Sequence, residues 1–460
     1  MTDERRLLAR TAEIAADFID SLDTRPVPAR GSVGELRVAL ARPLPQNPTD
    51  PVSVIEELAA AGELGVVGIP SGRYFGFVIG GAVPAALAAD WLASTWDQNA
   101  GLYACGPSAS VVEEVVGDWL KQLLGIPAHA SFALVTGCQM AHATCLAAAR
   151  NAVLADVGWN VEEAGLATAP PIRVLAGAKR HATIDRALRL LGLGTGAIAE
   201  IAADGQGRMD IAQLSAALAE SAGPTIVCAQ LGEVNTGSFD AAREIADVLE
   251  GTGAWLHVDG AFGLWAAASD AHAHLVNGHD RADSWTTDAH KWLNVPYDCG
   301  IAFVAHPERH RAAMTVRADY LVQAPDAVRD EVDWTPEFSR RARGFAVYAA
   351  LRSLGRSGVA DLVDRCCRHA ERFGEGLAEL PGCEILNEIV LNQVLFRFKD
   401  DATTSAVLRK VQESGEAWMS GTRWEGRSAI RISVSNWRTN EDDVVRTVAA
   451  FARAVEEIDA

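Results

Sequence analysis

The sequence of 460 residues is long enough for two or three structural units. Apolar residues make up 49% and charged residues 22%, which is typical of a globular chain and excludes disorder over most of its length. The net charge of −19 argues against a general nucleic-acid binder, because phosphate backbones are bound by clustered cations.

The cysteine pattern and the first residues favour a cytoplasmic protein. The eight cysteines show neither a CxxC pair nor the spacing of a zinc site, which fits a reducing compartment. The first 18 residues are charged and amphipathic, unlike a signal peptide. No apolar run reaches the roughly 20 residues that span a bilayer, so we expect no membrane partner.

Three segments are expected along the chain. Residues 1–81 are predicted to form an N-terminal arm, with a helix that ends near Ser21 and an extended stretch over the prolines and glycines of residues 24–51. Residues 82–340 form the expected large domain. Residues 341–460 contain long helices and the strand-like runs QVLFRF and AIRISVS, which predict a small α+β domain.

The large segment has the pattern of an α/β fold. Short β-branched or apolar runs alternate with helix-length stretches, which predicts a mostly parallel sheet wrapped by helices. Ligands of such sheets bind beyond the carboxyl ends of the strands, so the catalytic residues are expected there. The strand-like runs are FALVTG, IRVLAG, TIVCAQLG, WLHVDG, DSWTTD and GIAFVAH.

One lysine stands in an unusual setting. The chain has five lysines, and four of them neighbour other charges or lie in helical patterns typical of solvated side chains. Lys291 instead follows the run DSWTTD in DAHKWLNVPYDCG, among apolar and aromatic residues. Burial there is expected to lower its pKa and to free the amine for attack on a carbonyl group.

Three further features follow other strand-like runs. Asp259 lies at the end of the run WLHVDG, where it is either a buried carboxylate that needs a cation or a turn or capping residue. The turn at Cys138 and Gln139 follows FALVTG and opens a helix whose free N–H groups favour an anion such as phosphate. His181 follows IRVLAG and is suited either to stacking on a cofactor ring or to capping and packing.

The ordered motifs resemble the group II pyridoxal-dependent decarboxylases, which include aromatic-amino-acid, glutamate and histidine decarboxylases. They are TGCQMA, KRHATIDRA, HVDGAFG and DAHKW, and PSGRYFGFVIGGAVPAALAADWL and TPEFSRRARGFAVYAALRSLG extend the likeness over most of the chain. The resemblance implies an α/β architecture of fold type I, like aspartate aminotransferase, with a mostly parallel sheet of seven-stranded type. It also implies pyridoxal 5′-phosphate as the cofactor.

The resemblance assigns a role to each residue. Lys291 is the expected Schiff-base lysine, and Asp259 is the expected partner of the protonated pyridine nitrogen, which keeps the ring able to accept electrons. His181 is the expected ring-stacking histidine. The phosphate side is expected to involve Cys138, Gln139, Asp288 and His290, with Ser339 reaching the phosphate of the neighbouring subunit in a homodimer.

The sequence departs from the family at two positions. Val234 stands where members often have a threonine near the cofactor. Glu331 falls on the position of a mobile-loop tyrosine that is thought to protonate the substrate carbon, and replacement of that tyrosine can divert the reaction to oxidative aldehyde formation. The candidate proton donors are therefore Glu331, if its pKa is raised, the nearby Tyr320, and also His181 and Lys291.

Two other patterns favour ordinary structure. His272, His274 and His279 lack the matched carboxylates or cysteines of a metal site, so no metal is expected. The run GLGTGA at residues 192–197 lacks the GxGxxG spacing of a nucleotide loop and is predicted to be a glycine-rich turn.

The sequence therefore predicts pyridoxal-phosphate-dependent decarboxylation of an L-amino acid to an amine and carbon dioxide. Apolar or small residues around Phe77 and Tyr103 favour an aromatic or other bulky substrate. Aldehyde synthesis, carbon–carbon lysis and transamination on the same scaffold are the alternatives, because Glu331 replaces the tyrosine. A non-catalytic cofactor-binding scaffold or regulator is disfavoured, since it does not need the complete catalytic set.

Overall fold

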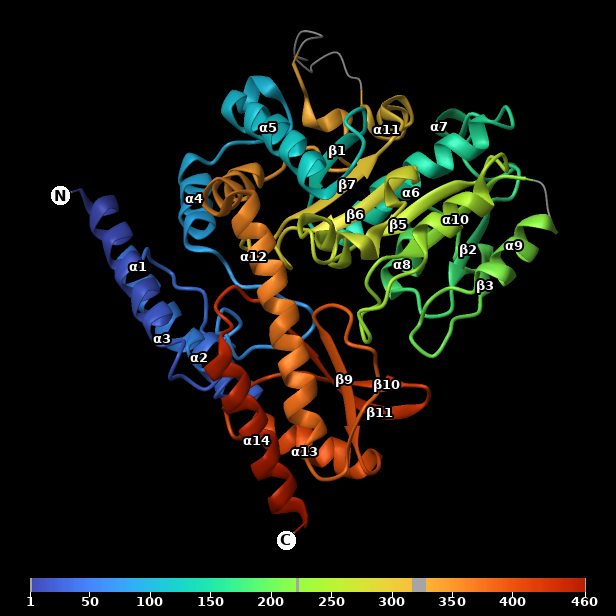
Figure 1. The fold of residues 1–460 in the computed structure, drawn as a ribbon. Coiled ribbons are helices and arrows are strands. Elements are labelled where there is room, and N and C mark those ends of the chain that lie inside the picture. The colour runs from blue at the N-terminus through green and yellow to red at the C-terminus, as the bar shows by residue number, and fades with distance from the viewer. Residues whose placement is uncertain (1, 221–222, 317–327, 460) are drawn as a thin grey trace.

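A seven-stranded sheet forms the centre of the larger part of this computed structural model, which describes residues 2–220, 223–316 and 328–459 (Figure 1). Its strand order is β1-β7-β6-β5-β4-β2-β3. Neighbours from β6 to β3 run parallel, whereas β7 is antiparallel to both β1 and β6, so the predicted mostly parallel sheet is confirmed. The strands are β1 (Ser131–Val135), β2 (Arg173–Gly177), β3 (Ile198–Ile201), β4 (Thr225–Gln230), β5 (Trp255–Asp259), β6 (Ser284–Asp288) and β7 (Gly300–Val304).

All six runs predicted in this segment are strands, because each is a short stretch of apolar or β-branched residues that the fold buries. β3 was not predicted. It is a partly exposed edge strand of four residues and therefore lacks a continuous apolar run. The glycine-rich residues 192–197 form a turn that leads into it, as expected.

Neighbouring residues of the central strands point into two different cores. In β2, Val174 and Ala176 join a cluster with α6 and α8, whereas Leu175 joins the cluster on the opposite face. Helices therefore cover both faces of the sheet, and α6, which is buried along most of its length, packs against β5, β6 and β7. The helices of this part are α4 (Pro84–Trp96), α5 (Pro107–Leu124), α6 (Cys138–Ala155), α7 (Val161–Ala164), α8 (Ala182–Leu190), α9 (Ile211–Ala219), α10 (Ala242–Leu249) and α11 (Pro307–Met314).

A second, four-stranded antiparallel sheet lies in the C-terminal part, with the order β10-β11-β9-β8. The two strands predicted there are β9 and β11, and the shorter or more polar β8 and β10 were not predicted. The long α12 packs against α4 and α5 near the large sheet and against α14, β8 and β9 near the small one (Figure 1). The elements are α12 (Gly344–Ala378), β8 (Cys383–Ile385), β9 (Gln393–Phe398), α13 (Asp401–Glu413), β10 (Ser420–Trp424), β11 (Arg427–Ser433) and α14 (Glu441–Asp459).

The N-terminal arm consists of α1 (Asp3–Asp20), α2 (Val33–Leu40) and α3 (Pro51–Gly62). α1 ends next to Ser21, as expected, but the stretch predicted to be extended contains α2. The reason is local: Ser32 and Glu35 form a reciprocal capping box that satisfies the free N–H groups at the start of this short helix.

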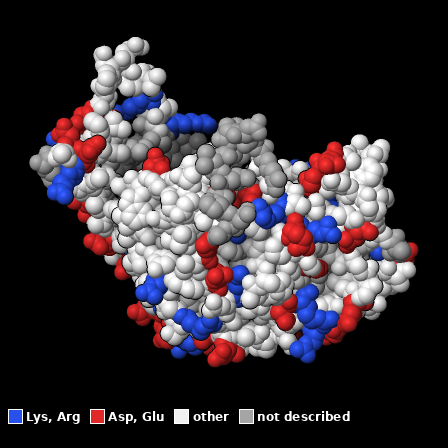
Figure 2. All heavy atoms as spheres, turned by 90° about the horizontal axis from the view of Figure 1, so that it is seen from above, with Lys and Arg blue, Asp and Glu red and all other residues white. Residues whose placement is uncertain are grey.

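The surface shows both signs of charge. On the face drawn in Figure 2, acidic and basic side chains are interspersed, although acidic residues outnumber basic ones in the sequence, 60 to 41. Within the described residues, no helix combines the length and the apolar character that crossing a membrane requires.

Candidate active site

A pocket of about 260 Å³ opens at the carboxyl ends of β1, β5 and β6, where ligands of α/β sheets bind. Asp259 is the last residue of β5, and Asp288 is the last residue of β6. Seven of the residues predicted for the site line this pocket: Cys138, Gln139, His181, Asp259, Asp288, His290 and Lys291. The chain folding thus brings together residues that the sequence separates by up to 153 positions.

Lys291 faces the pocket beside a carboxylate. Its Nζ lies 3.1 Å from Oδ2 of Asp288, which itself is almost fully buried. Burial alone would lower the pKa of Lys291, but Asp288 stabilises the ammonium form and raises the pKa above its usual value. The expectation that desolvation lowers the pKa of this lysine is therefore wrong for the cofactor-free chain, because the neighbouring carboxylate outweighs it.

Asp259 is 5% exposed, so its charge must be compensated inside the protein. The backbone N–H of Ala261 donates to Oδ1 at 3.1 Å, and Nε2 of His142 lies 3.5 Å from Oδ2. Burial alone would raise the pKa of Asp259, but the nearby His142, His181 and Lys291 bring it well below its usual value. The carboxylate is consequently ionised at neutral pH and is turned toward the pocket.

The turn between β1 and α6 has the geometry of an anion site. It approaches β7 so closely that a Cβ on Gly300 would lie 2.3 Å from the backbone of Gly137. The N–H of Cys138 donates to Oδ1 of Asp288 at 2.7 Å, so the start of α6 already binds a carboxylate. The side-chain oxygen of Gln139 is buried and has no hydrogen-bond partner among the described residues.

Two histidines complete the walls of the pocket. His181 is the N-cap of α8 and accepts from the N–H of Thr183, so it has the capping role that was one of its two predicted alternatives, and it also lines the pocket. Burial lowers the pKa of His181, which keeps its ring neutral at pH 7. His290 accepts from the N–H of Cys299 through Nδ1, and burial lowers its pKa as well.

Two of the predicted site residues, Glu331 and Ser339, do not line this pocket. Glu331 is 1% exposed and pairs with Arg329 at 2.7 Å, away from the residues that line the cavity. Ser339 is exposed and does not line the pocket of its own chain. Tyr320 lies outside the described residues.

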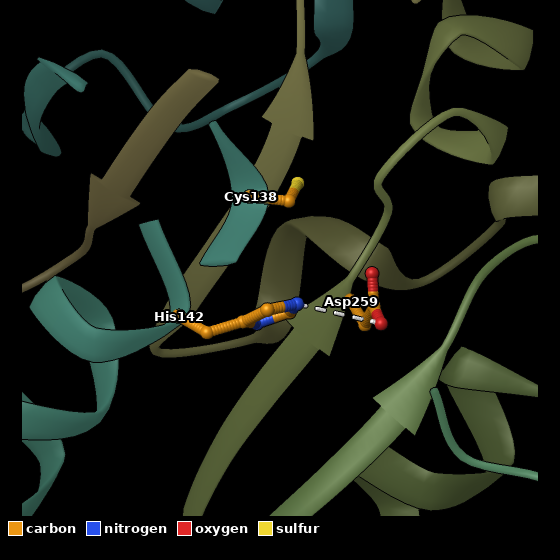
Figure 3. A group of neighbouring side chains, drawn as sticks. All are labelled: Cys138, His142 and Asp259. Atoms are coloured by element: carbon orange, nitrogen blue, oxygen red, sulfur yellow. Dashed lines mark ion pairs between the residues drawn. The ribbon is translucent and has the colours of Figure 1, made fainter. Parts of the chain in front are cut away.

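The histidines considered for a metal site have other partners. His272 pairs with Asp364, His274 with the carbonyl of Ala271, and His279 with backbone carbonyls of α5 and its own loop. A different trio, Cys138, His142 and Asp259, has donor atoms within 4.8 Å of one another (Figure 3). Cys138 and Asp259 line the same pocket as Lys291, and His142 lies directly behind it.

His142 and His257 were not identified from the sequence. His142 lies four residues after Cys138, one helical turn away, and His257 lies two residues before Asp259 on the same face of its strand. These spacings place both rings behind the pocket. They are the sequence feature from which the two histidines could have been predicted.

The comparisons with known proteins agree with this geometry. Residues 34–399 match the family described as the pyridoxal-dependent decarboxylase conserved domain. The chain belongs to this family. It is a carboxy-lyase that uses pyridoxal 5′-phosphate and acts on an amino acid, as the motifs predicted.

Individual relatives span nearly the whole chain. An aromatic-L-amino-acid decarboxylase of Bacillus atrophaeus is 26% identical and covers 99% of this chain and 96% of its own. An L-2,4-diaminobutyrate decarboxylase of Rhizobium meliloti is 30% identical over 82% of this chain and 76% of its own. The crystal structure of Oryza sativa TDC with PLP and tryptamine has a TM-score of 0.92 at 23% identity and covers 99% of this chain and 98% of its own, which confirms fold type I.

The residues of the pocket fit pyridoxal phosphate. A lysine amine faces the cavity, and an ionised aspartate lies at a neighbouring strand end. A buried polar atom beside them, Oε1 of Gln139, has no hydrogen-bond partner within the described part of the chain. An unpaired buried polar atom is costly, so its presence at the wall of a cavity indicates a polar ligand.

The substitution Asp288→Asn tests the control of Lys291. Asparagine keeps an oxygen for the N–H of Cys138 but removes the charge that stabilises the ammonium group, so the pKa of Lys291 is expected to fall by about 1 unit or more. The measurement is the pH dependence of acetylation of Lys291 in cofactor-free protein, followed by mass spectrometry. Lys410, which pairs with Glu457 on the surface, is the internal control. If the pH dependence of acetylation at Lys291 is the same in the variant, the account is contradicted.

Proposed function

We propose that Lys291 binds the cofactor through its amine and that Asp259 holds a proton on the ring nitrogen. The observation that carries this proposal is that both side chains enter one pocket from neighbouring strand ends, with Asp259 ionised. Bound pyridoxal phosphate supplies an electron sink for the carbanion left by loss of carbon dioxide. The charge of Asp259 favours the protonated, electron-accepting form of the ring.

The remaining pocket residues have positioning roles in this proposal. His181 stacks on the cofactor ring, and its neutral imidazole avoids repulsion of a protonated ring. The phosphate lies at the start of α6, where the helix end favours an anion. The residues proposed on that side are Cys138, Gln139, Asp288 and His290.

The proton that returns to the substrate carbon comes, in our proposal, from Lys291. Its ammonium group enters the pocket beside Asp288 and carries a proton at neutral pH, whereas the ring of His181 is neutral there. Glu331 of the same chain is committed to Arg329, and it remains a candidate donor only if that ion pair opens. Tyr320 remains a candidate from its sequence position alone.

The proposed substrate is an aromatic or other bulky L-amino acid. Phe77, Val234 and Phe262 give the pocket apolar walls, and Phe77 packs on Trp418, which stacks in turn on Tyr74. An aromatic ring buried against such walls gains both apolar burial and ring contacts. The relative from Bacillus atrophaeus is named for aromatic substrates, which supports this choice over the diaminobutyrate named for the relative from Rhizobium meliloti.

The reaction is tested with the cofactor-loaded protein and a panel of L-amino acids, with carbon dioxide, amine, aldehyde and peroxide followed together. We expect carbon dioxide and amine in equal amounts without peroxide, and a kcat/KM for tryptophan, tyrosine or phenylalanine at least about tenfold above that for 2,4-diaminobutyrate. Aldehyde with peroxide would instead favour the outcome named for a similar Rhodiola rosea protein, 4-hydroxyphenylacetaldehyde synthase. Absence of carbon dioxide from every amino acid would contradict the proposal.

We further propose a homodimer in the cytoplasm. The arm exposes Leu8, Val38, Leu44 and Leu58, with 90% of Leu44 accessible, and such a set of apolar side chains is typical of a surface that a partner covers. Ser339 is exposed and does not line the pocket of its own subunit, so in the proposed dimer it reaches the pocket of the partner subunit. All eight cysteines are free, which fits a reducing compartment.

Sedimentation velocity tests the dimer. We expect twice the chain mass of 48.9 kDa, and we expect Leu44→Asp to weaken dimerisation by about tenfold or more, because it places a charge in the covered surface. Val445→Asp, on α14 and also exposed, is the matched control and leaves the dimer unchanged. A monomer at micromolar concentration would rule out the proposed assembly.

A further inference from the structure

A row of buried polar side chains continues from Asp259 into the protein interior. His142 reaches from α6 toward the carboxylate at the end of β5 (Figure 3). Its Nδ1 lies 2.9 Å from Nε2 of His257, and Nδ1 of His257 lies 2.9 Å from Oγ of Ser284. The indole N–H of Trp255 donates to the same Oγ at 2.9 Å. Both imidazoles and Ser284 are fully buried.

The carboxylate determines where the protons of this row lie. An ionised aspartate only accepts hydrogen bonds, so Nε2 of His142 must carry a hydrogen to face Oδ2 favourably. In a neutral imidazole the other nitrogen is then an acceptor, so Nδ1 of His142 accepts from Nε2–H of His257. By the same rule Nδ1 of His257 accepts from the hydroxyl of Ser284. One set of protons thus satisfies each contact without a buried cation.

Burial favours this neutral arrangement over a charged one. Removal of His257 from water lowers its pKa to about 3, so it stays neutral over the physiological range. Two buried imidazolium rings in contact would repel each other at high cost. A neutral donor also leaves the negative charge of Asp259 uncancelled, which an imidazolium would not.

We propose that His142, backed by His257 and Ser284, is a positioning residue that holds Asp259 for the ring nitrogen of the cofactor. The N–H of Ala261 fixes Oδ1, and the imidazole N–H of His142 fixes Oδ2, so the carboxylate keeps both its direction and its charge. This inference rests on the proposed role of Asp259. The two atoms lie 3.5 Å apart, at the outer limit of a hydrogen bond.

The experiment compares two ligands and two substitutions at one position. Cofactor-free protein is titrated with pyridoxal phosphate and with its 1-deaza analogue, in which a carbon replaces the ring nitrogen, and binding is followed by tryptophan fluorescence. His142→Asn keeps a polar group for His257 but has no donor that reaches Asp259. His142→Gln places its amide N–H near the former Nε2 and is the conservative control.

We expect His142→Asn to weaken binding of pyridoxal phosphate by about tenfold, which is typical of a lost hydrogen bond to a charged group, and to leave binding of the deaza analogue unchanged. His142→Gln is expected to restore most of the difference. Equal losses for both ligands would show a merely structural role and would overturn the inference.

Asp259→Asn separates this inference from the function on which it rests. If Asp259 pairs with the ring nitrogen, this substitution abolishes the preference for pyridoxal phosphate over the deaza analogue. If Asp259→Asn weakens binding of both ligands by the same factor, the proposed role of Asp259 fails. If Asp259→Asn weakens binding of pyridoxal phosphate more than binding of the analogue, but His142→Asn weakens both equally, only the proposed role of His142 fails.

A second measurement needs no substitution. The ¹⁵N chemical shifts of the histidine rings in cofactor-free protein report which nitrogen of each ring carries hydrogen. We expect His142 and His257 both to be neutral, with hydrogen on Nε2. An imidazolium at His142, or hydrogen on Nδ1 in either ring, would overturn the inference.

Discussion

A charged carboxylate in the protein interior is the constraint on which the site depends. Asp259 ends β5 with 5% of its surface exposed, and such a charge is stable only if the fold surrounds it with compensating groups. Each neighbouring element supplies one: α6 brings His142, the start of α8 brings His181, and the segment after β6 brings Lys291. β2, β5 and β6 run in the same direction, and so does β1, because β7 is antiparallel to both β1 and β6. The segments that follow these strands therefore meet at one edge of the sheet.

A second carboxylate, that of Asp288, connects Lys291 to the start of α6. Asp288 accepts from the N–H of Cys138 and pairs with the ammonium group of Lys291. One side chain therefore links β1, α6 and the loop after β6. The same contact explains why the pKa of Lys291 is raised although the lysine is buried.

The sequence was most informative where burial is uniform. β5 and β6 were predictable because their residues are all buried: β5 reads as a short, mostly apolar run and β6 as a run of Trp285 and two β-branched threonines, and each ends in an aspartate. β3 and β8 were not, because they are short and partly exposed. The motifs placed Lys291 and Asp259 in one pocket because both follow such buried strands.

Contacts between distant segments were not predictable from one sequence. His142 and His257 are 115 residues apart, and only the packing of α6 on β5 brings their rings together. The ion pair of Glu331 with Arg329 is local in sequence, but its burial depends on the packing around α5 and β1. The burial of charged groups and the identity of their partners therefore follow from the three-dimensional packing and not from the sequence alone.

The most direct test of the central claim is the position of the covalent bond to the cofactor. The protein loaded with pyridoxal phosphate is reduced with borohydride and digested, and the labelled peptide is identified by mass spectrometry. The account predicts a pyridoxyl label on Lys291 and on no other lysine. A label on Lys121, Lys179, Lys399 or Lys410, or the absence of any label, would contradict it.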